Sequence, residues 1–322
     1  MSNNRLCKVL GIEKPIIQGP MAWVSTAPLV AAVSENGGLG VLGVGNAEFV
    51  REQIIATRKI TSKPFGINIF MVPGMVDMLT KVALEEKPPV IYADTVLGLD
   101  LELSKKYFSI WHEAGMKVIV KASTIQDAIT AEKAGADAVI VKGWEGGGHT
   151  TFEATTVLVP QAADVLSVPV AAAGGIADGR GMAAAIALGA DGIEMGTVFI
   201  CAEEAVIHPN VKQAMLKAGD METVITGNCT DEPCRQLQNK LSDEMIAIES
   251  NYIKKEAADR LRKIAASSLR NAMAEGDVEE KGAVMAGQIV PLITEIKSVK
   301  NIIDDVLKGY HETVANVTKF EV

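Results

Sequence analysis

Residues 168–197 read VPVAAAGGIADGRGMAAAIALGADGIEMGT, and the first half of this stretch has the pattern strand, glycine turn, helix. The short apolar run 168–173 is followed by Gly174 and Gly175, and Asp178 then stands in the N-cap position of a helix-forming segment. Glycines in such a turn let backbone N–H groups approach a ligand, and the helix adds the positive end of its dipole. The pattern predicts a phosphate-binding turn.

The second half of the stretch repeats this arrangement. The helix ends at Gly189, a second strand covers 191–195, and a turn with Gly196 and Thr197 follows. A single glycine motif of this kind is more often a simple tight turn than a ligand site. Two in succession, each after a strand, favour the functional interpretation, so we expect both turns to face the same anionic ligand.

The composition is that of an ordinary globular protein with a sizeable core. The chain has 322 residues, of which 48% are hydrophobic and 22% charged, and its formal net charge is −9. This negative charge argues against nucleic acid or an anionic membrane as the main partner. The N-terminal sequence lacks the apolar region of a signal peptide and no run is long enough to span a bilayer, so we expect a cytoplasmic protein.

The four cysteines, Cys7, Cys201, Cys229 and Cys234, are too few for a disulfide framework in so long a chain, which fits a reducing compartment. Cys229 and Cys234 lie five positions apart with no neighbouring ligand cluster, so we expect ordinary thiols there and no metal site.

Eight short apolar runs recur along the chain with helical segments between them. Their first residues lie 20 to 31 positions apart, the length of a strand, a returning helix and two loops. Eight such units predict a TIM-type (β/α)8 barrel, with a doubly wound open sheet as the alternative, because counting strands does not prove closure. In both folds, ligands bind at the carboxyl ends of the strands. The runs cover residues 15–19, 39–43, 64–69, 88–92, 117–121, 137–141, 168–173 and 191–195.

The segment GLGVLG, from Gly38 to Gly43, matches the dinucleotide-binding fingerprint G-x-G-x-x-G. That fingerprint follows a strand and opens a helix, whereas these glycines come after a helical segment (27–35) and lie within a strand. We therefore reject a Rossmann-type site there.

The pattern changes after residue 201. Residues 202–280 contain several helical stretches and no clear strand, 282–288 form a glycine-rich loop, and 298–318 form a closing amphipathic helix. The eighth barrel helix, still missing after the last strand, is assigned to this closing region. We therefore expect a barrel made of residues 1–201 and about 282–322, with 202–281 as a small helical lid over the strand ends.

The sequence GWEGGGHT (143–150) follows the sixth predicted strand, so it lies where ligands should bind. Its glycines let a ligand approach the backbone and give His149 little to pack against. A lone histidine is more often structural, but this setting favours a functional His149, as a proton donor or a hydrogen-bond donor to a carbonyl. The other histidines, His112, His208 and His311, are interpreted as structural.

Six motifs in this chain together resemble the flavin-dependent enoyl-acyl-carrier-protein reductases, and nearly as closely their relatives the nitronate monooxygenases and NADH:quinone reductases. The resemblance covers nearly the whole chain. It implies a TIM-type barrel with a lid, FMN at the strand ends, NAD(P)H as reductant and a homodimer. The motifs are PIIQGPMAWV (15–24), PFGINI (64–69), EGGGH (145–149), AAGGIADGRG (172–181), MGT (195–197) and VMAGQ (284–288).

The resemblance also assigns roles residue by residue, with His149 as the catalytic histidine. Structural alternatives exist: Met21 as core filling, Asn68 as a strand-end cap and Gln288 as a loop hydrogen bond. The implied cofactor-binding residues are Gly19, Met21 and Ala22 along the flavin ring, Asn68 hydrogen-bonded to it, Lys121, Gly147, Gly148 and Gln288 near it, and Gly174, Gly175, Gly196 and Thr197 around the phosphate.

Two departures separate the members of the superfamily. The reductases carry a GAGNP-like turn after the fourth strand, where this chain reads YADTVLG (92–98). The fifth strand ends in Lys121, as in the quinone reductases and monooxygenases, and a cation there suits the N1–C2=O edge of reduced FMN or its phosphate. VMAGQ favours the enoyl reductases, which we take as the first hypothesis.

In that hypothesis NAD(P)H reduces FMN, hydride passes from flavin N5 to the β-carbon of an enoyl thioester, and His149 polarises the thioester carbonyl or protonates the α-carbon. In the monooxygenase alternative, reduced flavin meets O₂ and NAD(P)H is not needed. A third hypothesis is a non-redox barrel that binds a phosphorylated metabolite.

A partner surface is suggested by charge. Residues 251–270 hold six basic and two acidic side chains, a local balance of +4. Acyl carrier proteins are acidic, so the enoyl-reductase hypothesis predicts docking on this helical segment. A solvated helix face is the alternative. The expected docking residues are Lys254, Lys255, Arg262 and Lys263.

Overall fold

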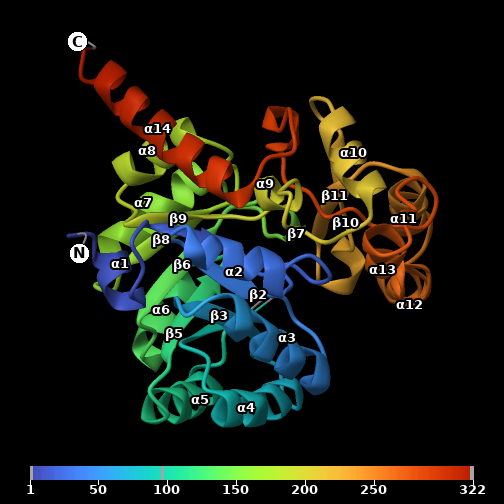
Figure 1. The fold of residues 1–322 in the computed structure, drawn as a ribbon. Helices are drawn as coiled ribbons and strands as arrows, with labels where there is room; N and C mark the ends of the chain where they lie inside the picture. The colour runs from blue at the N-terminus through green and yellow to red at the C-terminus, as the bar shows by residue number, and fades with distance from the viewer. Residues whose placement is uncertain (1–2, 96–97, 320–322) are drawn as a thin grey trace.

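Eight parallel strands close into a barrel that is surrounded by helices, as the computed structural model in Figure 1 shows. The structure describes residues 3–95 and 98–319. All eight predicted strands are present, and the TIM-type fold is confirmed. The barrel strands are β1 (Ile16–Gln18), β2 (Leu39–Leu42), β3 (Phe65–Phe70), β4 (Val90–Asp94), β5 (Lys117–Ala122), β6 (Ala138–Lys142), β8 (Val170–Ala173) and β9 (Gly192–Met195).

The closure of the barrel lies between the first and last strands. β1 pairs in parallel with β2 and also with β9, where Ile17 lies opposite Glu194 and Gln18 opposite Met195. An open doubly wound sheet would leave two edges unpaired, so the alternative fold is excluded. The carboxyl ends of all eight strands therefore meet at one end of the barrel.

Helices follow the barrel strands along the chain and cover the outside of the barrel. The closing helix α14 packs against α8, and a Cβ atom on Gly179 would lie 2.0 Å from the backbone nitrogen of Tyr310. The helices of this layer are α2 (Ala27–Glu35), α3 (Ala47–Ile60), α4 (Met75–Glu86), α5 (Leu101–Glu113), α6 (Ile125–Ala134), α7 (Thr155–Val165), α8 (Gly179–Ala187), α9 (Thr197–Ile200) and α14 (Val299–Val317).

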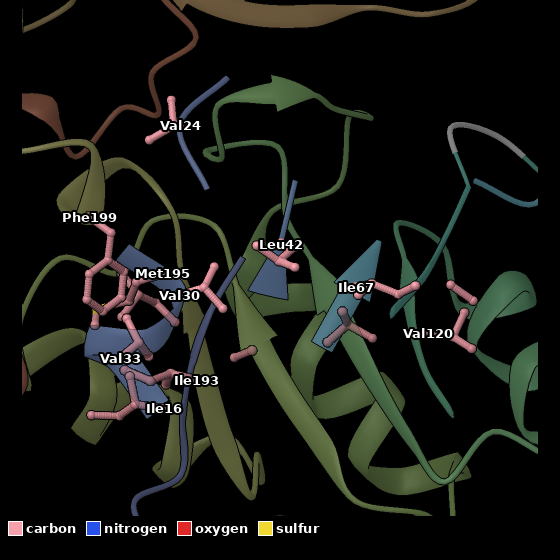
Figure 2. Packing of buried hydrophobic residues seen from close by; sticks show 14 of the residues in the cluster. Ile16, Val24, Val30, Val33, Leu42, Ile67, Val120, Ile193, Met195 and Phe199 are labelled. Atoms are coloured by element: carbon pink, nitrogen blue, oxygen red, sulfur yellow. The ribbon is translucent and has the colours of Figure 1, made fainter. Parts of the chain in front are cut away.

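The hydrophobic core has an outer part between strands and helices and an inner part within the barrel. In the outer part, Figure 2 shows Val33 of α2 beside Ile16 and Ile193, on the strands that close the barrel, and Val30 near Met195. The inner part includes alternate strand residues such as Ile17 and is joined by the N-terminal helix α1 (Arg5–Leu10). No helix in the described part of the chain is both long and apolar enough to cross a bilayer.

The glycines of GLGVLG allow close packing of a helix on a strand. They do not open a helix, as a dinucleotide-binding fingerprint would require. They lie in and around β2, after α2. A Cβ atom on Gly40 would lie 2.2 Å from the carbonyl oxygen of Val30, so only glycine lets α2 approach β2 this closely.

The prediction that residues 202–280 contain no clear strand was wrong. β10 (Thr223–Thr226) and β11 (Cys234–Leu237) form an antiparallel pair, and β11 also pairs with β7 (Gly148–His149), a strand that the prediction missed as well. These strands are short, and TVIT and CRQL lack a long apolar run because the sheet is small and partly exposed. The segment lies to one side of the barrel in Figure 1 and also contains α10 (Pro209–Lys217), η1 (Asn228–Thr230), α11 (Lys240–Asn251), α12 (Lys254–Ala265) and α13 (Ser268–Met273); η2 (Val290–Leu292) follows it.

Candidate active site

A cavity of about 310 Å³ lies at the carboxyl ends of the barrel strands. Residues of the 202–281 segment, Cys234, Leu269 and Met273, complete its wall. Of the thirteen site residues predicted from the sequence, twelve line this cavity: Gly19, Met21, Ala22, Asn68, Lys121, Gly147, Gly148, His149, Gly174, Gly175, Gly196 and Thr197.

The thirteenth residue, Gln288, has an exposed side chain outside the cavity lining. Its contact with the site runs through the main chain, because its backbone N–H donates to the carbonyl of Glu145 at 2.8 Å. The neighbouring Gly287 also packs against the site, and its N–H donates to Thr197 Oγ1 at 3.0 Å. The VMAGQ motif therefore binds the GWEGGGHT loop through a main-chain hydrogen bond, and its Gln288 side chain does not enter the cavity.

The first glycine turn has the conformation that its sequence requires. Gly174 and Gly175 both have positive φ, 87° and 73°, and a Cβ atom on Gly174 would lie 2.7 Å from the carbonyl oxygen of Gly143. Asp178 caps α8 by accepting from the N–H groups of Arg180 and Gly181. Two first-turn amides of α8 are thus engaged by that cap, and the turn itself faces the cavity.

The second turn lies beside the first. β8 and β9 are adjacent parallel strands, so Gly196 and Thr197 follow β9 at the same end of the barrel as Gly174 and Gly175. All four residues line the cavity. The structure therefore brings together two turns that lie more than 20 positions apart in the sequence, in the arrangement expected for one shared anionic group.

His149 lies on β7, between the barrel and the 202–281 segment. It is opposite Cys234 of β11 in the antiparallel pair, and its ring meets that of Phe70 edge to face with centroids 6.4 Å apart. From the barrel side, Lys142 Nζ donates to the carbonyls of Gly147 and His149 at 2.6 and 2.9 Å. The backbone of His149 is thus fixed on one side by β11 and on the other by Lys142, and this fixes where the imidazole enters the cavity wall.

The charge state of His149 follows from its surroundings. Burial lowers the pKa of His149 to about 4, and the positive charges of Lys121 and Lys142 act in the same direction, against the opposing effect of Asp94. The ring is therefore neutral near pH 7, with one N–H donor and one acceptor nitrogen.

Charged and polar side chains line the cavity at the ends of five barrel strands. Lys121 Nζ on β5 lies 2.6 Å from Asp94 Oδ1 on β4, and both side chains are buried. Burial raises the pKa of Glu194 on β9 to about 7, and burial together with the charge of Lys121 lowers the pKa of Lys142 on β6 to about 8. Such perturbed groups in a cavity are typical of functional sites.

Besides Asp94 Oδ1, which is ion-paired with Lys121, two buried oxygens in this wall have no hydrogen-bond partner among the described residues: Oδ1 of Asn68 and Oε2 of Glu194. Both residues line the cavity and are more than nine-tenths buried. Buried polar atoms are normally paired, so these two are suited to a ligand that brings N–H or O–H donors.

Sequence reasoning did not identify Asp94, Lys142 and Glu194 as site residues. Asp94 and Lys142 end their strands, and Glu194 is the last residue but one of β9. The other residues of these strands are mainly apolar, as in VIYAD, AVIVK and GIEM. A charged residue at the carboxyl end of a buried strand was the available indication. Of the altered turn 92–98, Val96 and Leu97 lie outside the described residues.

The predicted docking residues lie on or at the start of α12. The side chains of Lys254, Lys255, Arg262 and Lys263 are all exposed. Lys254 pairs with Asp231, and Arg262 pairs with Asp259. Among the described residues, no carboxylate lies within 4 Å of Lys255 or Lys263.

The other histidines lie on outer elements. His112 of α5 contacts Asp137 at 2.8 Å, His208 caps α10, and His311 lies on α14. In residues 3–95 and 98–319, no group of three or more His, Cys, Asp or Glu side chains is arranged to hold a metal ion.

The chain matches known proteins over nearly its whole length. The family model for nitronate monooxygenase matches residues 3–86 and 76–309. A probable nitronate monooxygenase of Staphylococcus aureus (strain JH9) is 34% identical over 313 residues, which cover 83% of this chain and 88% of that protein. FabK from Thermotoga maritima superposes with a TM-score of 0.92 at 41% identity, covering 100% of both chains. Nitroalkane oxidase from Streptomyces ansochromogenes has a TM-score of 0.78 at 28% identity, covering 95% of this chain and 98% of the other.

Proposed function

This chain belongs to the nitronate monooxygenase family and is an oxidoreductase of that superfamily, and from this premise we propose that it is an FMN-dependent enoyl-acyl-carrier-protein reductase with NAD(P)H as reductant. The observation that carries the proposal is the match to FabK, the enoyl-acyl-carrier-protein reductase II, at 41% identity over the full length of both chains. The nitroalkane oxidase match has 28% identity, and the curated nitronate monooxygenases 34%.

Members of this family are flavin-dependent, and the cavity fits FMN. The turns with Gly174, Gly175, Gly196 and Thr197 suit a phosphate group, because glycine leaves room for a ligand close to the backbone. The unpaired oxygens of Asn68 and Glu194 suit the N–H donors of a flavin ring.

The chemistry that FMN supplies when bound is transfer of a hydride from NAD(P)H to the β-carbon of a 2-enoyl thioester. For this reaction His149 acts as a neutral hydrogen-bond donor that polarises the thioester carbonyl, because its lowered pKa leaves little imidazolium near pH 7. Lys121, held by Asp94, places a fixed positive charge at the cavity wall, where it stabilises developing negative charge.

The experiment that tests the proposal compares two substrates on one preparation. We expect a yellow protein that oxidises NADH or NADPH anaerobically when crotonyl thioester is added. Aerobic O₂ uptake with a nitronate and no thioester reduction would overturn it in favour of a nitronate monooxygenase. A colourless protein that takes up no FMN would favour the non-redox phosphate-binding barrel.

The nitronate monooxygenase or quinone reductase activity is kept as the second candidate because of Lys121. This buried lysine is the feature that the sequence shares with those relatives, and it lies in the cavity wall. Both activities use the same FMN site, so only the substrate assays above separate them.

We also propose that an acyl carrier protein docks on α12 and that the protein acts as a homodimer. Contacts with Asp231 and Asp259 neutralise Lys254 and Arg262, so Lys255 and Lys263 are the stronger candidates for an acidic partner. Their attraction would act mainly on the association rate and weaken with salt.

A further inference from the structure

Arg235, on β11 of the 202–281 segment, is a buried cation without an acidic partner. Its residue is 3% exposed, and no carboxylate in the described part of the chain lies within 4 Å of it. Burial lowers the pKa of Arg235, although the charge of Glu145 opposes this effect. Burying a guanidinium is costly unless its N–H groups are well bonded, so its contacts indicate what it does.

Those contacts hold the loop that carries His149. Arg235 Nε donates to the carbonyl of Trp144 at 3.0 Å, and its guanidinium carbon lies 5.3 Å from the centre of the Trp144 ring. The backbone of Arg235 pairs with Gly148, directly before His149. One residue therefore contacts both the start and the end of the 144–149 loop.

The guanidinium is itself oriented by the segment it comes from. In addition to the Nε contact with Trp144, Nη1 of Arg235 donates a hydrogen bond to Thr223 Oγ1 on β10, at 3.1 Å. The planar fork of arginine can reach Trp144 and Thr223 together, which the single ammonium of lysine cannot do with the same geometry. On the barrel side, Lys142 binds the carbonyls of Gly147 and His149.

We propose that Arg235 is a positioning residue that fixes His149 relative to the cavity by joining its loop to the 202–281 segment. Arg235 does not line the cavity and acts through Trp144 and Gly148. The assignment of His149 to substrate reduction rests on the proposed function, whereas the mechanical link between Arg235 and the loop does not.

The test compares Arg235→Met, Arg235→Lys and Thr223→Val, with Arg270→Met as the control. Arg270 lies on α13 of the same segment and pairs with the exposed Glu275. Two readouts need no substrate: amide hydrogen exchange of residues 143–150, and NMR titration of the His149 ring, assigned with His149→Asn. The third is steady-state kinetics with crotonyl thioester.

We expect faster exchange at 143–150 in all three variants, while exchange at 174–197 is unchanged. The titration of His149 should move from about 4 towards its ordinary value of 6.5 as the ring becomes more exposed. The kcat should fall by about 10²-fold in Arg235→Met, because a small misplacement of a catalytic group is enough for such a loss. The fall should be smaller in Arg235→Lys and Thr223→Val. FMN content and flavin reduction by NAD(P)H should match the control.

If Arg235→Met does not fold, Arg235→Lys and Thr223→Val carry the test. The proposal is overturned if these variants keep the wild-type exchange at 143–150 and the wild-type His149 titration and lose only global stability. If wild-type protein reduces no enoyl thioester, the proposed function fails, while the exchange and titration still decide the role of Arg235.

Discussion

Lys121 Nζ lies 2.6 Å from Asp94 Oδ1, and these two buried side chains lie near the carboxyl ends of the neighbouring strands β5 and β4. The contact is an ion pair without an aligned hydrogen bond on that oxygen. Since each charge is removed from water, each depends on the other for compensation.

Replacing Lys121 by Met should destabilise the protein by about 3–5 kcal/mol, because it leaves Asp94 as an uncompensated buried charge. The double variant Lys121→Met/Asp94→Asn should recover most of this loss. The measurement is urea unfolding of the cofactor-free protein. A single variant within about 1 kcal/mol of wild type, or a double variant less stable than the single, would contradict the ion-pair account.

Replacing Gly175 by Asp should abolish FMN binding, because the new carboxylate would repel a phosphate in the turn. Gly175→Asn adds similar bulk without charge and should retain more flavin. Gly115→Asp is the strain control: its φ is 86°, close to the 73° of Gly175, and nothing lies within 4 Å of its added Cβ. Flavin content after gel filtration is the readout, and a folded Gly175→Asp protein with full flavin would refute the phosphate assignment.

Replacing His149 by Ala should slow substrate reduction by about 10²–10⁴-fold, the usual contribution of acid–base or hydrogen-bond assistance. Flavin reduction by NAD(P)H should stay within a few-fold, because His149 is assigned to the thioester carbonyl. Stopped-flow measurement of the two half-reactions separates these effects. Equal losses in both would mean that the histidine shapes the site and takes no part in the chemistry.

The pH dependence of the free energy of unfolding should report the lowered pKa of His149. Its folded-state pKa of about 4 lies below the ordinary value of 6.5, so between these values the unfolded chain binds a proton that the folded chain does not. Stability from this group is complete above pH 6.5 and falls as the pH is lowered towards 4. Wild type should therefore lose stability relative to His149→Asn over that range in urea unfolding.

Glu194 titrates in part of the same range, with the opposite sign. Its pKa is raised to about 7, so between pH 4.5 and 7 the folded chain binds a proton that the unfolded chain does not. The contribution of Glu194 to stability is therefore lost as the pH rises through this range. Because Glu194 is present in both proteins, the difference between wild type and His149→Asn isolates the histidine. No difference in slope would contradict the burial of a neutral ring.

Charge reversal on α12 tests the acyl-carrier-protein surface. Lys255→Glu/Lys263→Glu should raise the KM for an acyl-carrier-protein substrate at low ionic strength and leave the KM for a small crotonyl thioester unchanged. Arg262→Glu/Lys263→Glu should do the same, with a smaller effect because Arg262 is paired with Asp259. Lys81→Glu/Lys133→Glu, on α4 and α6 of the barrel, is the charge-matched control. An equal response of both substrates, or of neither, would exclude docking on α12.

The barrel and the position of its two glycine turns were predictable because they depend on local sequence. Each strand is a short apolar run, and the turns of Gly174 and Gly196 follow such runs directly. The sheet β10–β11–β7 was not predictable in this way, since Gly148 and His149 pair with residues more than 80 positions later in the chain. The role of Arg235 was hidden for the same reason: an arginine in CRQL resembles a solvent-exposed residue until its partner Trp144 is placed beside it.

The pairing of β7 with β11 also determines which parts of this protein could be inherited or exchanged as a unit. A segment that replaced residues 202–281 alone would bring a new β11 against the old Gly148 and His149, and a new residue in place of Arg235 beneath Trp144. The loop 143–150, and the stretch 284–288 that is hydrogen-bonded to it, would therefore have to be exchanged together with residues 202–281. The glycine turns at 174–175 and 196–197 follow β8 and β9 and belong to the barrel instead.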